Sequence, residues 1–338
     1  MQFENVSVRS LAYLDAPHRV TSTEICEKLR SSMSRLGFRQ DFLESLTGIV
    51  ARRFWDPGVQ PSQVAAQAGE QAIQRAEIDR NEIGLIVNTS VCKDYIEPSV
   101  ASMVHHSLRL SSRCLNFDVG NACLAFLNGM AIAGNMIERG QINHALIVDG
   151  EGARHICERT IDRLNDPLTD DRRFRDNFAS LTLGSGAVAM VLSRSDLAPD
   201  GHRFLGGVNL AASEYNQLCR GNPDEMVTDA SGLLVAGLEL ARRTWDLAVK
   251  ELGWVTGELK EYVLHQVSAV HTDRLISTLR LPHDKVHRIF PEFGNIGPAS
   301  LPIALAKAAE NGRIQKGDRV GLLGIGSGLN CSMMEVVW

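Results

Sequence analysis

The stretch that decides the fold is "GNACLAFLNGMAIAGNMIERGQINHALIVDGEG", residues 120–152. It returns in altered form near the C-terminal end, as "GNIGPAS" at 294–300 and "ENGRIQKGDRVGLLGIGSG" at 310–328. Both copies begin with a Gly-Asn pair, continue into a helical pattern and end in an apolar run that leads into glycines. A segment of this length that occurs twice indicates that the chain consists of two duplicated halves and not of a solenoid of many units.

Short apolar runs rich in Val and Ile surround the first copy and are typical of buried strands. They cover residues 83–90, 114–119, 144–150 and 187–193. Helical patterns lie between them, including 61–78, where Ser62 is placed as an N-cap. The alternation predicts α/β layers. Pro, Gly and charged residues cluster at 194–206, so we expect an N-terminal half over 1–195 and a C-terminal half over 196–338.

The overall composition bounds the class of protein. Of the 338 residues, 44% are hydrophobic and 22% are charged, which is typical of soluble globular proteins of one large or two medium domains. The net charge of −5 is spread over interspersed acids and bases, so we expect no nucleic-acid partner. There is no basic segment followed by an apolar run at the N-terminus, and no uncharged apolar run of about 18 residues. We therefore predict a cytoplasmic protein without a membrane-spanning segment.

The seven cysteines include no CxxC pair, which predicts free thiols in a reducing compartment, one of them reactive. His283 and His287 are four residues apart but lack the glutamate of the HExxH zinc motif. The "GIGSG" run at 324–328 lacks the third glycine of a dinucleotide-binding loop. We therefore expect neither a metal ion nor a bound cofactor.

Cys123 stands where an extended apolar stretch gives way to a helix. At such a position the thiol faces unpaired backbone N–H groups and the positive helix end, which predict a lowered pKa and a nucleophilic thiolate. The alternative is a packing residue, because free cysteine is among the most buried residue types. In the repeat, Cys123 corresponds to Gly297, so the two halves share a scaffold and differ in chemistry.

Two polar residues of the second half follow apolar strands, His265 in "YVLHQVS" and Asn295 in "GNIGPAS". Taken singly, His265 reads as a core histidine and Asn295 as a turn residue, since Asn tolerates left-handed geometry. A pseudo-twofold relation between the halves would bring both toward the helix start at Cys123. There they could polarise a carbonyl oxygen or stabilise the charge that develops on it. Their joint placement favours a catalytic function.

These three segments, "NACLAF", "LHQVS" and "GNIGPAS", resemble the Cys-His-Asn triad of the thiolase superfamily, in its ketoacyl-synthase III branch. The segments "TGIVARRFW" (47–55) and "LGSGAVAMVL" (183–192) resemble further parts of that branch. Within it, "NTSVCKDYIEPSVAS" and "LCRGNPDEMVTD" are similar to the enzymes that join fatty acyl-CoAs in bacterial olefin biosynthesis. The resemblance implies an α/β thiolase fold with a five-layered αβαβα sandwich, and a homodimer.

The resemblance also implies a reaction, the non-decarboxylative Claisen condensation of two long-chain fatty acyl-CoAs to a 2-alkyl-3-ketoacyl thioester or β-keto acid. Cys123 would carry the first acyl group. His265 and Asn295 would stabilise oxyanion or enolate charge, and the backbone amides of Cys123 and Ser327 would form a second oxyanion hole. Glu97, in "DYIEPS", matches the glutamate that removes the α-proton in the partner subunit's site.

Other implied assignments concern charged side chains. Buried beside acyl chains, Glu97 would have a raised pKa and be a better base, whereas on its own it reads as a loop acid ahead of a helix starting near Pro98. Arg52 and Arg53 are suited to the phosphates of CoA, although surface arginines are common. Enzymes of the downstream olefin pathway are possible partners.

Two other functions stay open from the sequence. One is a decarboxylative ketoacyl-ACP synthase III that uses malonyl-ACP; Glu97 weighs against it, as does Gly-Asn-Ile at 294–296 where that group usually carries Gly-Asn-Thr. The other is a non-catalytic thiolase-fold subunit that binds acyl groups. The intact Cys123, His265 and Asn295 weigh against a silent subunit, which has no chemical need for all three.

Overall fold

The computed structural model describes residues 1–338 and contains one nine-stranded mixed sheet in the order β11-β12-β13-β8-β1-β7-β6-β4-β5. The strands from the N-terminal part are β1 (Val6–Asp15), β4 (Ile83–Asn88), β5 (Leu115–Asp118), β6 (His144–Glu151) and β7 (Gly186–Arg194). Those from the C-terminal part are β8 (His202–Ala211), β11 (Glu261–Leu264), β12 (Arg319–Gly326) and β13 (Asn330–Val337). The four apolar runs predicted as strands are thus confirmed.

The strand pairing is the same on both sides of the sheet. β1 and β7 are antiparallel, β7 and β6 antiparallel, and β6 and β4 parallel. β8 and β13, β13 and β12, and β12 and β11 repeat this pattern in the same order. The two sets meet only where β1 pairs with β8, at Ser7 with Arg203 and Val8 with His202. The repeat in the sequence is therefore a repeat of topology, and the chain passes from one set to the other between β7 and β8.

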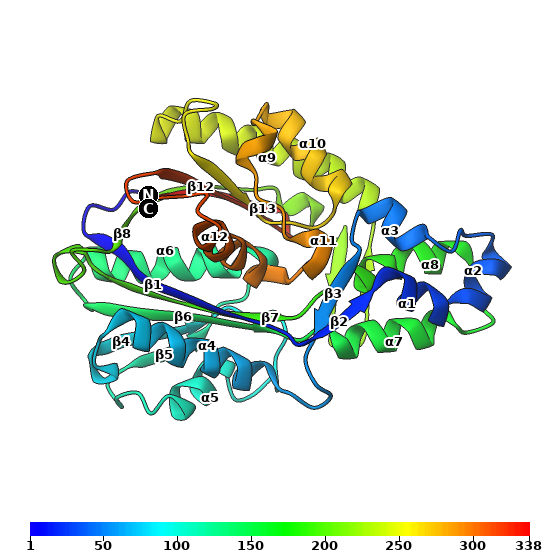
Figure 1. Ribbon diagram of the computed structural model, residues 1–338, viewed down its shortest axis with the longest axis horizontal. Coiled ribbons are helices and arrows are strands. Elements are labelled where there is room, and N and C mark those ends of the chain that lie inside the picture. The colour runs from blue at the N-terminus through cyan, green and yellow to red at the C-terminus, as the bar shows by residue number, and fades with distance from the viewer.

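Helices cover the strands in layers (Figure 1). α4 (Pro61–Ala76) and α5 (Val100–Ser107) pack on the outer face of the first set of strands. α9 (Ala230–Leu252) and α10 (Ala269–Leu279) cover the outer face of the second set. α6 (Ala125–Glu138) and α12 (Ser300–Glu310) lie between the two sets. This is the predicted αβαβα order of layers.

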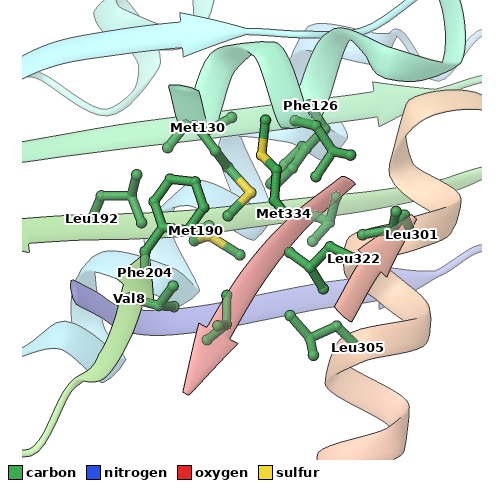
Figure 2. Close-up of a cluster of buried hydrophobic side chains, with 14 of the residues drawn as sticks. Val8, Phe126, Met130, Met190, Leu192, Phe204, Leu301, Leu305, Leu322 and Met334 are labelled. Carbon is green, nitrogen blue, oxygen red and sulfur yellow. The ribbon is translucent and has the colours of Figure 1, made fainter. Parts of the chain in front are cut away.

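The largest buried apolar cluster occupies the middle layer (Figure 2). It joins Phe126 and Met130 of α6 and Leu301 of α12 to strand residues from both halves, such as Met190 of β7 and Met334 of β13. Burying one side chain of this size contributes about 1.5–3 kcal/mol. Because α6 and α12 each contact both sets of strands, this cluster holds the halves together.

A smaller group of helices lies beside the sandwich, at the right of Figure 1, and has its own apolar cluster. It consists of α1 (Ser22–Lys28), α2 (Arg30–Leu36), α3 (Phe42–Thr47), α7 (Arg154–Leu164) and α8 (Asp171–Asn177). Two short two-stranded sheets complete the fold, β2 (His18–Thr21) with β3 (Ala51–Phe54) and β9 (Cys219–Gly221) with β10 (Met226–Thr228). None of the helices combines the length and the apolar character needed to cross a membrane.

The start of α4 differs from the sequence-based expectation. The helix begins at Pro61 with Gln60 as its N-cap, so Ser62 lies in the first turn. Proline is favoured at the first helical position because its fixed φ suits the helix. The backbone N and the hydroxyl of Ser62 donate to Asp94, at 2.9 and 2.5 Å. A carboxylate from a distant loop thus supplies the negative charge that a helix N-terminus favours.

One glycine in the fold fixes the turn that carries Asn295, and it yields a testable prediction. Gly184 donates to the Asn295 carbonyl at 2.8 Å, and a Cβ at Gly184 would lie 1.9 Å from the Phe293 carbonyl oxygen. We expect Gly184→Ala to lower the free energy of unfolding by more than about 2 kcal/mol in urea titrations, because the clash is with backbone. At Gly152 an added Cβ meets no atom within 4 Å, so Gly152→Ala should change stability by less than about 0.5 kcal/mol. Equal stability of the two variants would contradict the tight contact.

Candidate active site

Cys123 lies in a short 3₁₀ turn, η2 (Ala122–Leu124), that follows β5 and leads into α6. Ala122 has a φ of +46°, a left-handed conformation that costs a residue with a Cβ about 1–2 kcal/mol. Asn121 fastens the turn, since its Nδ2 donates to Asn128 at 2.7 Å and its Oδ1 accepts from Asn330 at 3.1 Å. The half-buried Cys123 is therefore held on a strained and anchored turn.

The end of β12 closes on this turn. A Cβ at Gly326 would lie 3.4 Å from the Cys123 backbone nitrogen and 3.2 Å from the Asn121 carbonyl oxygen. A glycine without a side chain permits this approach of two backbones. Ser327 follows directly and is half-buried. The structure thus brings the segment directly before Ser327 against the Cys123 turn.

Asn295 reaches the same place from the second half. Its backbone nitrogen donates to the Thr182 carbonyl at 2.9 Å, and its Oδ1 accepts from the Gly297 backbone at 3.0 Å. Gly297 begins the 3₁₀ turn η7 (Gly297–Ala299), which packs against η2. With the Oδ1 engaged, the Nδ2 of Asn295 is oriented as the donor of this side chain and is not bonded to a protein acceptor.

His265 follows β11, where its backbone nitrogen donates to Leu323 of the neighbouring β12 at 2.9 Å. The side chain is buried, and its Nδ1 has no hydrogen-bond partner. Desolvation, together with the nearby His271, lowers the pKa of His265 to about 3. The imidazole is therefore neutral at physiological pH and can hydrogen-bond to a carbonyl oxygen.

The electrostatics at Cys123 overturn one expectation. Desolvation, reinforced by the negative charge of Glu151, raises the pKa of the Cys123 thiol to about 12. The helix end does not compensate, because the thiol lies in a desolvated space that it shares with carboxyl groups of β6. In the free site Cys123 is a thiol and not the predicted thiolate.

The two acids near Cys123 are Asp149 and Glu151, and neither was predicted as a site residue from the sequence. Both are buried at the end of β6, and burial raises the pKa of both carboxyls, that of Glu151 to about 7. Glu151 accepts a hydrogen bond from the Val91 backbone at 2.6 Å. The repeat itself carried the signal, because "GEG" at 150–152 aligns with "GSG" at 326–328 and so places Glu151 opposite Ser327.

Glu97 is not brought to the other site residues within one chain. It is exposed on the loop between β4 and α5 and makes no hydrogen bond or ion pair. The two residues before it are apolar and equally exposed, Tyr95 at 59% and Ile96 at 96%. The stem of this loop is fixed, since Lys93 forms an ion pair with Asp118 at 2.9 Å.

The two arginines differ from each other. Arg52 is fully buried, where its Nη1 donates to the Ser22 hydroxyl at 3.1 Å and burial lowers the pKa of its guanidinium to about 10. The assignment of Arg52 to CoA phosphates is therefore wrong for this structure, because its side chain does not reach the surface. Arg53 is half-buried with its guanidinium 5.1 Å above the Phe293 ring, and its assignment stays a prediction. No group of three or more His, Cys, Asp or Glu side chains is placed to hold a metal ion.

Comparison with known families and proteins shows to which family the chain belongs. Residues 117–211 match the 3-oxoacyl-[acyl-carrier-protein] synthase III model, and residues 249–338 match its C-terminal domain. The acyl-CoA:acyl-CoA alkyltransferase of Xanthomonas campestris is 53% identical, and that of Shewanella oneidensis 37%, each over 100% of both chains. The β-ketoacyl-ACP synthase III of Neisseria meningitidis is 27% identical over 97% of both chains.

Solved structures give the same result. The cerulenin-bound crystal structure of Xanthomonas OleA superimposes with a TM-score of 0.98 at 53% identity, over 100% of this chain and 98% of that one. A variant of the same protein with a cysteine replaced by alanine superimposes equally well, with a TM-score of 0.98 at 52% identity and the same coverage. The chain therefore belongs to the OleA group of acyltransferases, within the 3-oxoacyl-ACP synthase III branch of the thiolase superfamily.

Proposed function

We propose that this enzyme joins two fatty acyl-CoAs head to head by a non-decarboxylative Claisen condensation. The observation that carries the proposal is the packing of the Cys123 turn against the Asn295 turn and against the end of β12 before Ser327. It is supported by the buried, neutral His265, whose backbone bonds to Leu323 of the same strand β12. Structures of Xanthomonas OleA include variants with a cysteine, a histidine or a glutamate replaced. Those three positions are separated by the same two sequence intervals as Glu97, Cys123 and His265, which supports the assignment.

In the first step Cys123 attacks the thioester carbonyl of one acyl-CoA. A new bond forms between its Sγ and the carbonyl carbon, the carbon–sulfur bond to CoA breaks, and the thiol proton leaves with CoA as its free thiol. Because the free Cys123 is protonated, this proton must move as the new bond forms. The backbone amides of Cys123 and Ser327 stabilise the oxyanion that develops on the carbonyl oxygen.

In the second step Glu97 of the partner subunit removes an α-proton from a second acyl-CoA. The enolate oxygen is stabilised by the neutral His265 and the Nδ2 of Asn295. Its α-carbon attacks the acyl carbon on Cys123, the Cys123 carbon–sulfur bond breaks, and the proton held by Glu97 returns to the sulfur. The product is a 2-alkyl-3-ketoacyl-CoA, which water hydrolyses to the β-keto acid and CoA.

The surface features of the single chain support a homodimer. β5 is an edge strand of the nine-stranded sheet, with Leu115 53% exposed, and proteins cover or pair such edges. The loop carrying Glu97 follows the neighbouring β4 and exposes Tyr95 and Ile96. A partner docked along this edge would bury these apolar side chains and place Glu97 near its own Cys123.

The first prediction from the proposed function concerns the substrate. Incubated with myristoyl-CoA alone, the pure protein should yield the C27 ketone or its β-keto acid precursor in lipid extracts, because no malonyl donor is required. Cys123→Ala should yield neither product and should not become acylated. Acylated Cys123 and free CoA without condensed lipid in the unsubstituted protein would instead favour a malonyl-dependent synthase or an acyl-binding subunit.

The second prediction separates the two steps. Glu97→Gln should still form acyl-Cys123, seen by intact-protein mass spectrometry, while condensation falls by about 10²-fold or more because the base is lost. Mixing Glu97→Gln with Cys123→Ala subunits should restore part of the activity, since each heterodimer contains one complete site. Absence of any recovery would place the base in the same subunit as Cys123.

The third prediction follows from the raised pKa of Cys123, about 12. Below this pKa the thiolate fraction grows with pH, so the rate of Cys123 alkylation by iodoacetamide should rise about tenfold per pH unit from about pH 7 to 9. Peptide mass spectrometry separates Cys123 from the other cysteines. A plateau below about pH 8 would mean that the helix end overcomes the desolvation.

A further inference from the structure

The loop that carries Glu97 is fastened at its start to the end of β6. The Gly150 backbone donates to the Ser90 hydroxyl at 2.8 Å. The backbone nitrogens of Val91 and Cys92 donate to the two carboxyl oxygens of Glu151, at 2.6 and 3.4 Å. Glu151 is 5% exposed, so its carboxyl group is largely shielded from water, and the two hydrogen bonds are partly buried. A buried carboxyl that accepts two backbone N–H groups is a strong local anchor.

The same carboxyl also lies beside the turn of Asn295. A Cβ at Gly297 would lie 3.5 Å from the Glu151 carboxyl carbon and 3.7 Å from its Oε2. Gly297 donates its backbone N–H to the Asn295 Oδ1, and this bond orients the Asn295 amide. Glu151 therefore lies between the loop of one predicted catalytic residue and the turn of another.

The duplication relates Glu151 to a residue of the catalytic side. In the repeat, Gly297 corresponds to Cys123 and Glu151 to Ser327. On the catalytic side the glycine before Ser327 closes on Cys123, and on the opposite side Glu151 closes on Gly297. The position equivalent to Ser327 thus carries, in the first half, a carboxyl group that lies beside the Asn295 turn.

We propose that Glu151 is a positioning residue for the condensation step, in which one buried carboxyl fixes both the start of the Glu97 loop and the turn that presents Asn295. This assignment rests on the proposed function. Glu151 acts through these two segments and not on the substrate. Its loss should impair the step that uses Glu97 more than the acylation of Cys123.

The charge of Glu151 provides an independent readout. The titratable groups that face Cys123 are Glu151 and Asp149 from β6 and Cys219 from β9, and Cys92 faces Glu151 from the loop. The first of these has the largest Coulombic influence on Cys123. Removing its negative charge should therefore make the thiolate of Cys123 easier to form.

The test compares Glu151→Gln, which removes the charge, with Glu151→Asp, which keeps it on a side chain one methylene shorter. Glu138→Gln is the matched control, because Glu138 also accepts two backbone N–H bonds, from Glu4 and Asn5, but these bonds are exposed. Three measurements are made on the purified full chain. They are hydrogen exchange over residues 89–99, the pH profile of Cys123 alkylation, and acyl transfer against condensation with myristoyl-CoA.

We expect both Glu151 variants to exchange the Val91 and Cys92 amides about tenfold faster and to lose condensation by about tenfold or more, with acyl transfer changed less than about threefold. Only Glu151→Gln should shift the alkylation profile, by about one pH unit toward lower pH. Glu138→Gln should behave as the unsubstituted protein in all three.

Unchanged exchange and an unchanged ratio of the two steps in both variants would overturn the proposal. So would an equal loss of acyl transfer and condensation, because that reports a general structural defect. If the unsubstituted protein makes no condensed lipid, the proposed function fails, but hydrogen exchange and alkylation still decide whether Glu151 anchors the loop and acts on Cys123.

Discussion

The close approach of the β12 end to the Cys123 turn is the contact on which the rest of the site depends. An added Cβ at Gly326 would lie 3.4 Å from the Cys123 nitrogen, so the backbones of the two halves meet with no side chain between them. This approach is possible because α6 and α12 share one buried core with strands of both halves. The layered fold therefore holds the end of β12 against the Cys123 turn. The candidate active site lies at this junction.

Much of this layered fold could be predicted, because hydrophobic patterning specifies it directly. The strand over 144–150 contains the continuous apolar run Ala145–Val148 and ends at a glycine, a pattern typical of a buried central strand. The repeated Gly-Asn pairs likewise located the turns of Cys123 and Asn295. The start of α4 was harder to predict from the sequence, because the carboxyl that bonds to its first turn comes from Asp94, a loop residue 32 positions away in the chain.

The charged residues were harder to predict, since their behaviour depends on burial and not on their type. Arg52 and Arg53 are neighbours in sequence, yet alternation along β3 buries the first completely and leaves the second half-buried. The prediction that the pKa of Cys123 is lowered was wrong for the same reason. A helix end lowers the pKa of a thiol most where the thiolate stays hydrated. At Cys123, desolvation and the charge of Glu151 both raise the pKa and outweigh the helix end.

A site with a protonated cysteine and a neutral histidine has a consequence for its order of events. In the proposed reaction neither of these two side chains carries charge before acyl-CoA arrives, so neither pays the cost of a buried ion. Charge appears first on the carbonyl oxygen of the substrate, next to backbone amides that are already in place. Preorganised donors of this kind need no reorganisation when the charge develops, which is where they contribute most to the rate. In the proposed reaction Glu97 supplies the negative charge of the base, from a separate loop, and it acts in the second step. The placement of Cys123 on an anchored turn and of Glu97 on an exposed loop thus matches the two steps, acylation and condensation, of the proposed reaction.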